Sequence, residues 1–200
     1  MKAPRKKSQT NKKGTNTLRI IGGQWRSRKL QFTDAPGLRP TPDRVRETLF
    51  NWLQADIHHA TCLDLFAGSG ALGMEALSRG AKDVVFVENN IAAASQLKNN
   101  LELLKAEATV IHNDALAFLN TQSCQGISFD VIFLDPPYRQ SLLERSLRLL
   151  IEVKLIDKNT LIYLEHEQEE SFNWADYNLQ ILKETHAGQV QSFLLKQDKR

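Results

Sequence analysis

The sequence predicts an α/β domain built on a doubly wound, mostly parallel β-sheet. Apolar runs of strand length alternate with helical patterns from Cys62 onward, which is typical of helices packed on both faces of such a sheet. A glycine turn, Gly68-Ser69-Gly70, joins the first of these strands to the first helix and opens a nucleotide-binding βαβ unit, as in Rossmann-like folds. With 200 residues, 42% of them hydrophobic, the chain can bury one core of ordinary size.

Basic charge is concentrated at the start of the chain. Residues 1–48 contain 13 Lys and Arg against 3 acidic side chains, a net charge of +10, whereas the remaining 152 residues contain 13 against 20, a net charge of −7. Residues 1–17 offer almost nothing to bury, so we expect a disordered basic tail. A basic arm on an acidic domain favours a polyanionic partner, although a solubilising tail would explain the lysine runs equally well.

Residues 18–40 are predicted to form a basic β-hairpin followed by a loop. Gly22-Gly23 would be the turn between strand-like runs at 18–21 and 24–32. Trp25 and Lys29 would share one face of the second run, and Arg26 and Arg28 the other. Such a strand suits RNA, through phosphate contacts and base stacking, although Trp25 could equally hold the hairpin against the domain. The predicted RNA-binding residues are Arg19, Trp25, Arg26, Arg28, Lys29, Arg39, Arg44 and Arg46.

A helix is predicted to begin the main domain, which spans residues 41–200. Thr41 has the side chain of an N-cap, and Pro42 suits the first helical position. The apolar stripe consists of Val45, Leu49, Trp52 and Leu53, and the polar residues that face elsewhere are Arg44, Arg46 and Glu47. Because this helix leads into the first strand of the sheet, its start should lie near the nucleotide pocket.

The remaining elements follow from hydrophobic periodicity. Strands are predicted at 62–65, 84–87, 109–112, 129–134 and 160–164, and helices at 71–79, 91–104, 115–119 and 142–151. The runs 177–183 and 190–196 flank a glycine-containing turn and predict a C-terminal antiparallel hairpin that closes the sheet. No apolar run approaches the roughly 18 residues that cross a bilayer, so we expect no membrane segment.

Acidic side chains follow four of the predicted parallel strands: Asp64, Glu88, Asp114 and Asp135. The carboxyl ends of parallel strands meet at one edge of a sheet, so these carboxylates should line the ligand site. Although the glycines of the turn, with Gly73, satisfy a dinucleotide fingerprint, a carboxylate four residues before Gly68 would repel a diphosphate. A ligand with an ammonium, a sulfonium and two ribose hydroxyls fits better, and S-adenosylmethionine has those groups and no phosphate.

The stretch Asp135-Pro136-Pro137-Tyr138 ends the fourth strand and indicates the chemistry. Two successive prolines remove two backbone donors and hold the chain extended, which leaves the carbonyls fixed and free. The amino group of a nucleobase is a poor nucleophile. Hydrogen bonds to the Asp135 carboxylate and the Pro136 carbonyl would aim its lone pair at a sulfonium methyl. Tyr138 offers a face on which a flipped base can stack. We therefore predict these four residues to be catalytic.

These stretches resemble a known family. L-D-L-F-A-G-S-G and D-P-P-Y resemble class I S-adenosylmethionine-dependent methyltransferases that modify base amino groups. More specifically, L-R-I-I-G-G-Q-W-R-S-R-K-L at 18–30 and R-P-T-P-D-R-V-R-E-T-L-F-N-W-L at 39–53 resemble bacterial enzymes that methylate N2 of a guanine in small-subunit 16S ribosomal RNA. The resemblance covers about residues 18–196.

The resemblance implies a role for each acid. Asp64 would lie near the methionine end of the cofactor, Glu88 would hold the ribose hydroxyls, Asp114 would accept from the adenine amino group, and Asp135 would hold the target amine. The predicted cofactor-binding residues are Asp64, Phe66, Ala67, Gly68, Ser69, Gly70, Glu88, Asn89, Asp114, Ala115 and Asp135.

The expected protein is thus a monomeric cytoplasmic enzyme that acts on 16S rRNA or the 30S subunit. The five histidines lack metal-ligand spacing, so no metal is expected, and two cysteines suggest a reducing compartment. Three alternatives remain open from the residues: a DNA adenine-N6 or cytosine-N4 methyltransferase, a non-catalytic RNA-binding assembly factor, and a dehydrogenase. Nothing in the pocket motifs chooses guanine over adenine.

Overall fold

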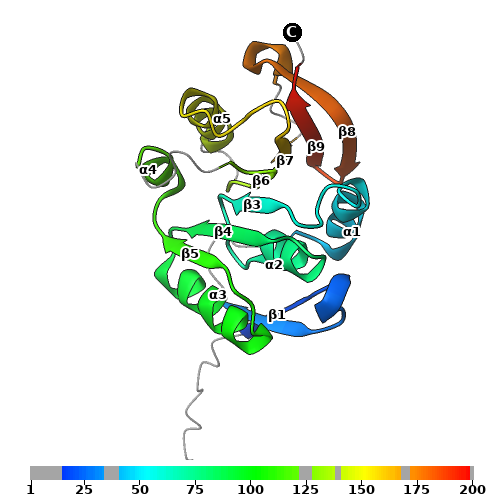
Figure 1. The fold of residues 1–200 in the computed structure, drawn as a ribbon, viewed down its shortest axis with the longest axis vertical. Helices are drawn as coiled ribbons and strands as arrows, with labels where there is room; N and C mark the ends of the chain where they lie inside the picture. Colours follow the sequence, from blue (N-terminus) through cyan, green and yellow to red (C-terminus); the bar gives the residue numbers. More distant parts are fainter. Residues whose placement is uncertain (1–14, 34–40, 122–127, 138–140, 168–171, 199–200) are drawn as a thin grey trace, which may run out of the picture.

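The computed structural model describes residues 15–33, 41–121, 128–137, 141–167 and 172–198 (Figure 1). The expected tail lies outside these residues except for its last three, which belong to a strand rather than to a disordered segment. Two predicted site residues, Arg39 and Tyr138, also lie outside the described residues.

The predicted mostly parallel sheet is confirmed. In the described residues its strands follow the order β5-β4-β3-β6-β7-β9-β8. The first five strands in this order are parallel, and β9 is antiparallel to both β7 and β8. The strands are β3 (Thr61–Asp64), β4 (Asp83–Glu88), β5 (Thr109–His112), β6 (Val131–Leu134), β7 (Leu161–Glu167), β8 (Leu179–Ala187) and β9 (Val190–Gln197).

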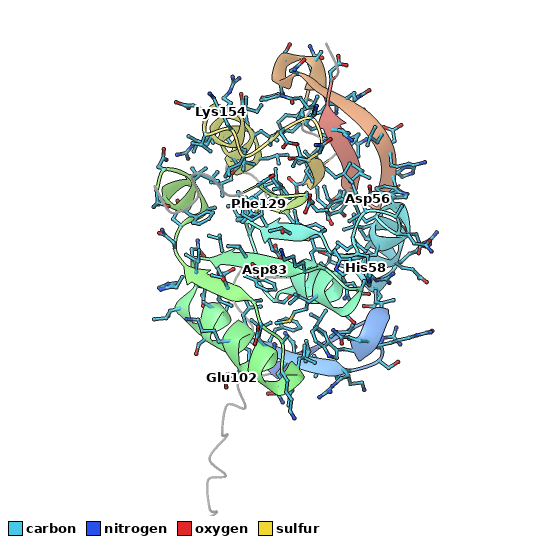
Figure 2. The ribbon with its side chains drawn as sticks, in the orientation of Figure 1. Asp56, His58, Asp83, Glu102, Phe129 and Lys154 are labelled. Atoms are coloured by element: carbon cyan, nitrogen blue, oxygen red, sulfur yellow. The ribbon has the colours of Figure 1, made fainter. Side chains whose placement is uncertain are left out.

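Helices cover both faces of this sheet (Figure 1). They are α1 (Asp43–Trp52), α2 (Ala71–Ser78), α3 (Ile91–Leu104), α4 (Ala115–Leu119) and α5 (Leu142–Glu152), with a 3₁₀ turn η3 at Trp174–Tyr177. Alternate side chains of each strand enter different cores: Phe86 packs in one with α1, α2 and α3, whereas Val85 packs in the other with α4 and α5. The packed side chains are drawn in Figure 2, where the labelled Phe129 belongs to the second core.

The strand order reverses at β3, which positions the site. The chain leaves β3 through α2 to β4 on one side, and later returns to pair β6 with β3 on the other side. In a doubly wound sheet, the carboxyl ends of two strands that diverge in this way leave a crevice where ligands bind. Asp64 is the last residue of β3, and Asp135 follows directly after β6.

A separate two-stranded hairpin precedes α1. Strands β1 (Thr15–Arg19) and β2 (Lys29–Thr33) pair antiparallel, which confirms the predicted N-terminal hairpin. The predicted turn and strand start are wrong, because residues 20–28 form a longer connection that contains the 3₁₀ turn η1 (Gly23–Trp25). The Ile20 amide donates to the Arg28 carbonyl at 2.9 Å, and the Ser27 amide donates to the Ile20 carbonyl at 2.8 Å. Trp25, Arg26 and Arg28 therefore lie in this connection and not on strand faces.

The start of α1 also differs from the prediction. Pro42 occupies the N-cap position, and no side chain caps the helix there. Thr41 is buried, and its hydroxyl donates instead to Asp135 at 3.2 Å. The expected N-cap is thus turned toward the site. None of the described helices is long and apolar enough to span a membrane.

Candidate active site

The glycine turn forms the floor of the site between β3 and α2. The Gly70 amide donates to the Ala67 carbonyl at 2.7 Å, and Ala67 in turn donates to the Val87 carbonyl at 3.0 Å. Gly70 has a φ of +76°, and a Cβ at this position would lie 2.2 Å from Leu97 Cδ2. Only glycine suits this combination of a left-handed backbone and a close neighbour, so the turn packs tightly against Leu97.

Asp64 is almost fully enclosed beneath this turn. Its side chain accepts a 3.0 Å hydrogen bond from the amide of Gly73, in the first turn of α2. Burial raises the pKa of Asp64 to about 7, opposed by the Gly73 amide and reinforced by the carboxylates of Asp135 and Glu88. The structure thus brings three of the four predicted acids close enough to interact.

Glu88 ends β4 and connects two loops of the site. One of its carboxylate oxygens accepts from the Gly68 amide at 2.7 Å, and the other accepts from the Asn90 amide at 2.7 Å. Asn89 is exposed, and its carbonyl lies 3.0 Å from His112 Nε2. The acid therefore fixes the glycine turn relative to the start of α3.

Asp114 lies farther along the same edge as the N-cap of α4. Its carboxylate accepts from the Ala117 amide at 2.9 Å. Asp114 is exposed and Ala115 is buried, so this acid is accessible to a ligand on its open side. Of the other predicted cofactor residues, Phe66 is half-buried and Ser69 is buried.

Asp135 lies where β6 meets the start of α1. Its Oδ2 accepts from the Thr41 hydroxyl at 3.2 Å. Burial raises the pKa of Asp135 to about 6, against the opposing effect of the Thr41 hydrogen bond. Pro136 is buried and Pro137 is exposed, while the fourth residue of this motif is outside the described chain.

Glu165 is a neighbour of Asp135 that the sequence reasoning missed. β6 and β7 are paired in parallel with Leu134 opposite Leu164, so Asp135 and Glu165 are the next residues along this register. Burial raises the pKa of Glu165 to about 8, the carboxylate of Asp135 adds to the rise, and the Tyr163 hydroxyl, which donates at 2.6 Å, opposes it. The signal was available, since Glu165 follows an apolar run just as the four predicted acids do.

Ile91, the first residue of α3, is a candidate ligand contact that the sequence reasoning did not include. Its side chain is 70% exposed although it is a large hydrophobic group. It follows the Glu88 loop at the carboxyl edge, where an apolar side chain can contact the flat ring of a nucleoside. The signal for Ile91 was weak, because the helical pattern alone does not distinguish an exposed from a buried first position.

The predicted RNA-binding residues do not share one environment. Arg26, Arg28, Lys29 and Arg44 are exposed, and Arg19 is exposed and paired with Asp43 at 2.8 Å. Trp25 is half-buried against the core, with its amide bonded to Ser78 Oγ at 3.0 Å, so it helps to hold the hairpin connection in place.

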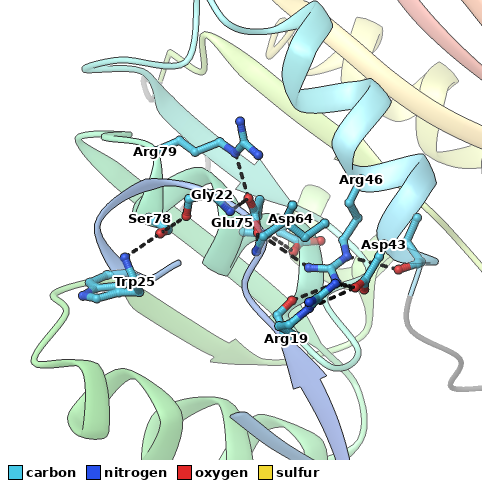
Figure 3. A network of polar contacts seen from close by, with 12 residues as sticks. Arg19, Gly22, Trp25, Asp43, Arg46, Asp64, Glu75, Ser78 and Arg79 are labelled. Atoms are coloured by element: carbon cyan, nitrogen blue, oxygen red, sulfur yellow. Dashed lines mark hydrogen bonds and ion pairs between the residues drawn. The ribbon is translucent and has the colours of Figure 1, made fainter. Parts of the chain in front are cut away.

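The prediction that Arg46 faces away from the buried side of its helix is wrong. Its side chain does not face away from the apolar stripe but is only 1% exposed, within a network of polar groups between α1, α2 and the hairpin (Figure 3). A helical pattern predicts a surface position for an arginine by default. Two of the groups that stabilise this one, the Arg19 carbonyl and Glu75, come from distant parts of the chain.

Comparison with known proteins assigns the chain to a family. The family model described as "Conserved hypothetical protein 95" matches residues 18–196. "Ribosomal RNA small subunit methyltransferase D" of Escherichia coli (strain K12) is 48% identical over 181 residues, which cover 90% of each chain. The protein of the same name from Haemophilus influenzae is 49% identical over 193 residues, covering 92% of this chain and 96% of that one.

A solved structure agrees with the sequence comparison. The structure of yhhF from Escherichia coli superposes with a TM-score of 0.84 at 46% identity, covering 92% of this chain and all of that one. The sheet order, the glycine turn and the acids at its edge therefore belong to a shared methyltransferase fold. These methyltransferases are relatives of the chain, and the chain belongs to the Conserved hypothetical protein 95 family.

Proposed function

We propose that this protein transfers a methyl group from S-adenosylmethionine to the exocyclic N2 amine of a guanine in 16S rRNA. The observation that carries the proposal is the placement of Asp135 and Pro136 at the carboxyl end of β6, beside the β3 edge that carries Asp64 and the glycine turn. The names of the relatives support small-subunit ribosomal RNA as the substrate. The choice of guanine N2 rests on the family resemblance of residues 18–53.

The residues of the crevice fit this cofactor. Asp64, Glu88 and Asp135 are close enough that the other two raise the pKa of Asp64, and a positively charged ligand would relieve that repulsion. Asp64 would face the methionine end, Glu88 the ribose hydroxyls, and Asp114 with the exposed Ile91 the adenine. When bound, the cofactor supplies an electrophilic methyl group on a positively charged sulfur.

The protein's own contribution to the transfer is orientation of the target amine. Asp135 and the Pro136 carbonyl would accept hydrogen bonds from its two N–H groups, which favours a pyramidal nitrogen with its lone pair directed at the methyl group. Forming the new N–C bond obliges the nitrogen to release one proton, which the Asp135 carboxylate can accept. Tyr138 remains the proposed stacking surface for the flipped base.

The RNA would contact the exposed basic residues of the hairpin and of α1. These are Arg19, Arg26, Arg28, Lys29 and Arg44, to which Arg39 is added from outside the described residues. Arg46 is left out of this surface because its guanidinium is buried. We propose a monomer that acts in the cytoplasm on 16S rRNA, either free or within the 30S subunit.

The test is a methyl-transfer assay with labelled cofactor and three substrates: 16S rRNA, 30S subunits and duplex DNA. Label is expected in ribosomal RNA. Asp135→Ala should lower turnover by about a thousandfold, since it removes a group that acts on the reacting amine, while the cofactor Kd changes only a few-fold. Label in DNA alone would contradict the substrate, and near-normal turnover by Asp135→Ala would contradict the role of Asp135.

A further inference from the structure

A buried arginine links the N-terminal hairpin to the first residues of α1. Arg46 Nη2 donates to the Arg19 carbonyl at 2.9 Å and to Asp43 Oδ1 at 2.6 Å (Figure 3). Its Nε donates to the Thr41 carbonyl at 3.1 Å. A charge buried to this degree is costly unless it is paired, so these contacts hold the guanidinium in one place.

Glu75 of α2 anchors the other side of this network. Its side chain is fully buried, and Arg46 Nη1 lies 3.6 Å from one of its oxygens. The carboxylate accepts from the amides of Ile21 and Gly22 at 2.8 Å each and from Arg79 Nε at 2.7 Å. The hairpin, α1 and α2 are therefore joined through groups that cannot move independently.

Thr41 carries this network to the site. Its backbone carbonyl is held by Arg46, and its buried hydroxyl donates to Asp135 Oδ2. Thr41 thus binds the Arg46 guanidinium through its main-chain carbonyl and the Asp135 carboxylate, at the end of β6, through its side chain. Capping of α1 does not explain the hydroxyl, because no side chain caps that helix.

We propose that Thr41 is a positioning residue for methyl transfer, fixed by Arg46, which orients the Asp135 carboxylate toward the base amine and couples it to the docked hairpin. The inference rests on the proposed function of Asp135. With Oδ2 engaged by Thr41, Asp135 presents its other oxygen to the substrate. The same hydrogen bond favours the ionised carboxylate, the form that accepts from an amine.

The test compares Thr41→Val, which keeps the shape and removes the hydroxyl, with Thr41→Ser, which keeps the hydroxyl. Thr41→Val should lower kcat on 16S rRNA about tenfold and leave the cofactor Kd nearly unchanged, and Thr41→Ser should recover most of the loss. The acid limb of the kcat profile should move to higher pH in Thr41→Val. Asp135 also faces Asp64, Glu165 and Tyr163, and these groups are the same in every variant.

Arg46→Lys tests the coupling, alone and combined with Thr41→Val. If Arg46 acts through Thr41, the double variant should lose no more kcat than Thr41→Val alone, whereas independent effects would multiply and contradict the coupling. Thermal melts and cofactor binding show that each variant is folded. A Thr41→Val enzyme with wild-type kcat and pH profile would overturn the inference while an inactive Asp135→Ala leaves the proposed function standing. An active Asp135→Ala would overturn both.

Discussion

At the scale of single residues, the site is defined by carboxyl groups that are crowded and poorly solvated. Asp64, Asp135 and Glu165 each have a raised pKa, with burial as the largest cause. Charges of one sign are brought together only where something compensates them, and a cationic ligand is the compensation that this site suggests. In the free protein the crowding should appear as a cost in stability.

Asp64 gives a pH dependence whose sign can be stated. Its folded pKa of about 7 exceeds the ordinary 3.8, so between these values the folded state keeps a proton that the unfolded state has lost. Protonation of Asp64 therefore contributes to the free energy of unfolding at acidic pH, and this contribution is lost as the pH rises from about 4 to about 7. In urea denaturation of the free protein, the free energy of unfolding of Asp64→Asn should vary less with pH than that of the wild type. At about pH 8 it should exceed the wild-type value by on the order of 1 kcal/mol. Parallel profiles for the two proteins would contradict this reading of Asp64.

Two residue-level results show what the sequence could and could not provide. Asp64, Glu88 and Asp135 were predictable because the register of parallel strands alone brings their carboxyl ends together. Arg46 was not, because its burial depends on Glu75 and on the carbonyl of Arg19, which is 27 residues away in the chain. Periodicity describes a helix face and not what the fold places against it.

At the scale of elements, the hairpin connection shows the same limit. The strands and helices of the sheet have strong hydrophobic periods, and their predicted and observed bounds differ by only a few residues. The sequence predicts the hairpin turn at Gly22-Gly23, but the Glu75 carboxylate, 54 and 53 residues away, accepts hydrogen bonds from the amides of Ile21 and Gly22 and holds the chain in a different path. The local preference of the two glycines for a hairpin turn is thus overridden by hydrogen bonds to the distant, buried carboxylate of Glu75.

Gly23 gives this docking a test. It has a φ of +72°, and a Cβ there would lie 1.8 Å from the Ser78 carbonyl oxygen, against the backbone of α2. Gly23→Ala should therefore lower the free energy of unfolding by about 2 kcal/mol or more, because either the hairpin or α2 must shift. Gly188→Ala is the matched control, since Gly188 has a φ of +62° with nothing within 4 Å of the added Cβ. It should cost only about 1 kcal/mol of backbone strain. Equal losses in urea denaturation would show that the close approach to α2 does not matter.

At the scale of the whole molecule, charge separates two tasks. The net charge of +10 in residues 1–48 suits a polyanion, and the −7 of the remainder surrounds a site proposed for a cation. The basic hairpin packs on the start of α2, where Leu18 and Phe32 contact Ala71, next to the glycine turn. RNA held by the hairpin would therefore lie close to the crevice.

Charge reversal in the hairpin connection tests this division. Arg26 and Arg28 are exposed, so the double variant Arg26→Glu, Arg28→Glu should fold and bind cofactor normally. It should bind 16S rRNA more weakly, and the negative slope of log K against log salt should become shallower by about 2, because two phosphate contacts are lost. Lys82→Glu, an exposed charge reversal just before β4, is the control. An unchanged slope in the double variant would remove these arginines from the RNA surface.

The most direct test of the central claim is the nucleoside content of 16S rRNA after reaction with this protein and S-adenosylmethionine. Mass spectrometry of digested RNA should show N2-methylguanosine at one mapped position with the wild-type protein, and no increase above background with Asp135→Ala. Methylation of adenine or cytosine, or unmodified RNA from an active and folded preparation, would contradict the claim.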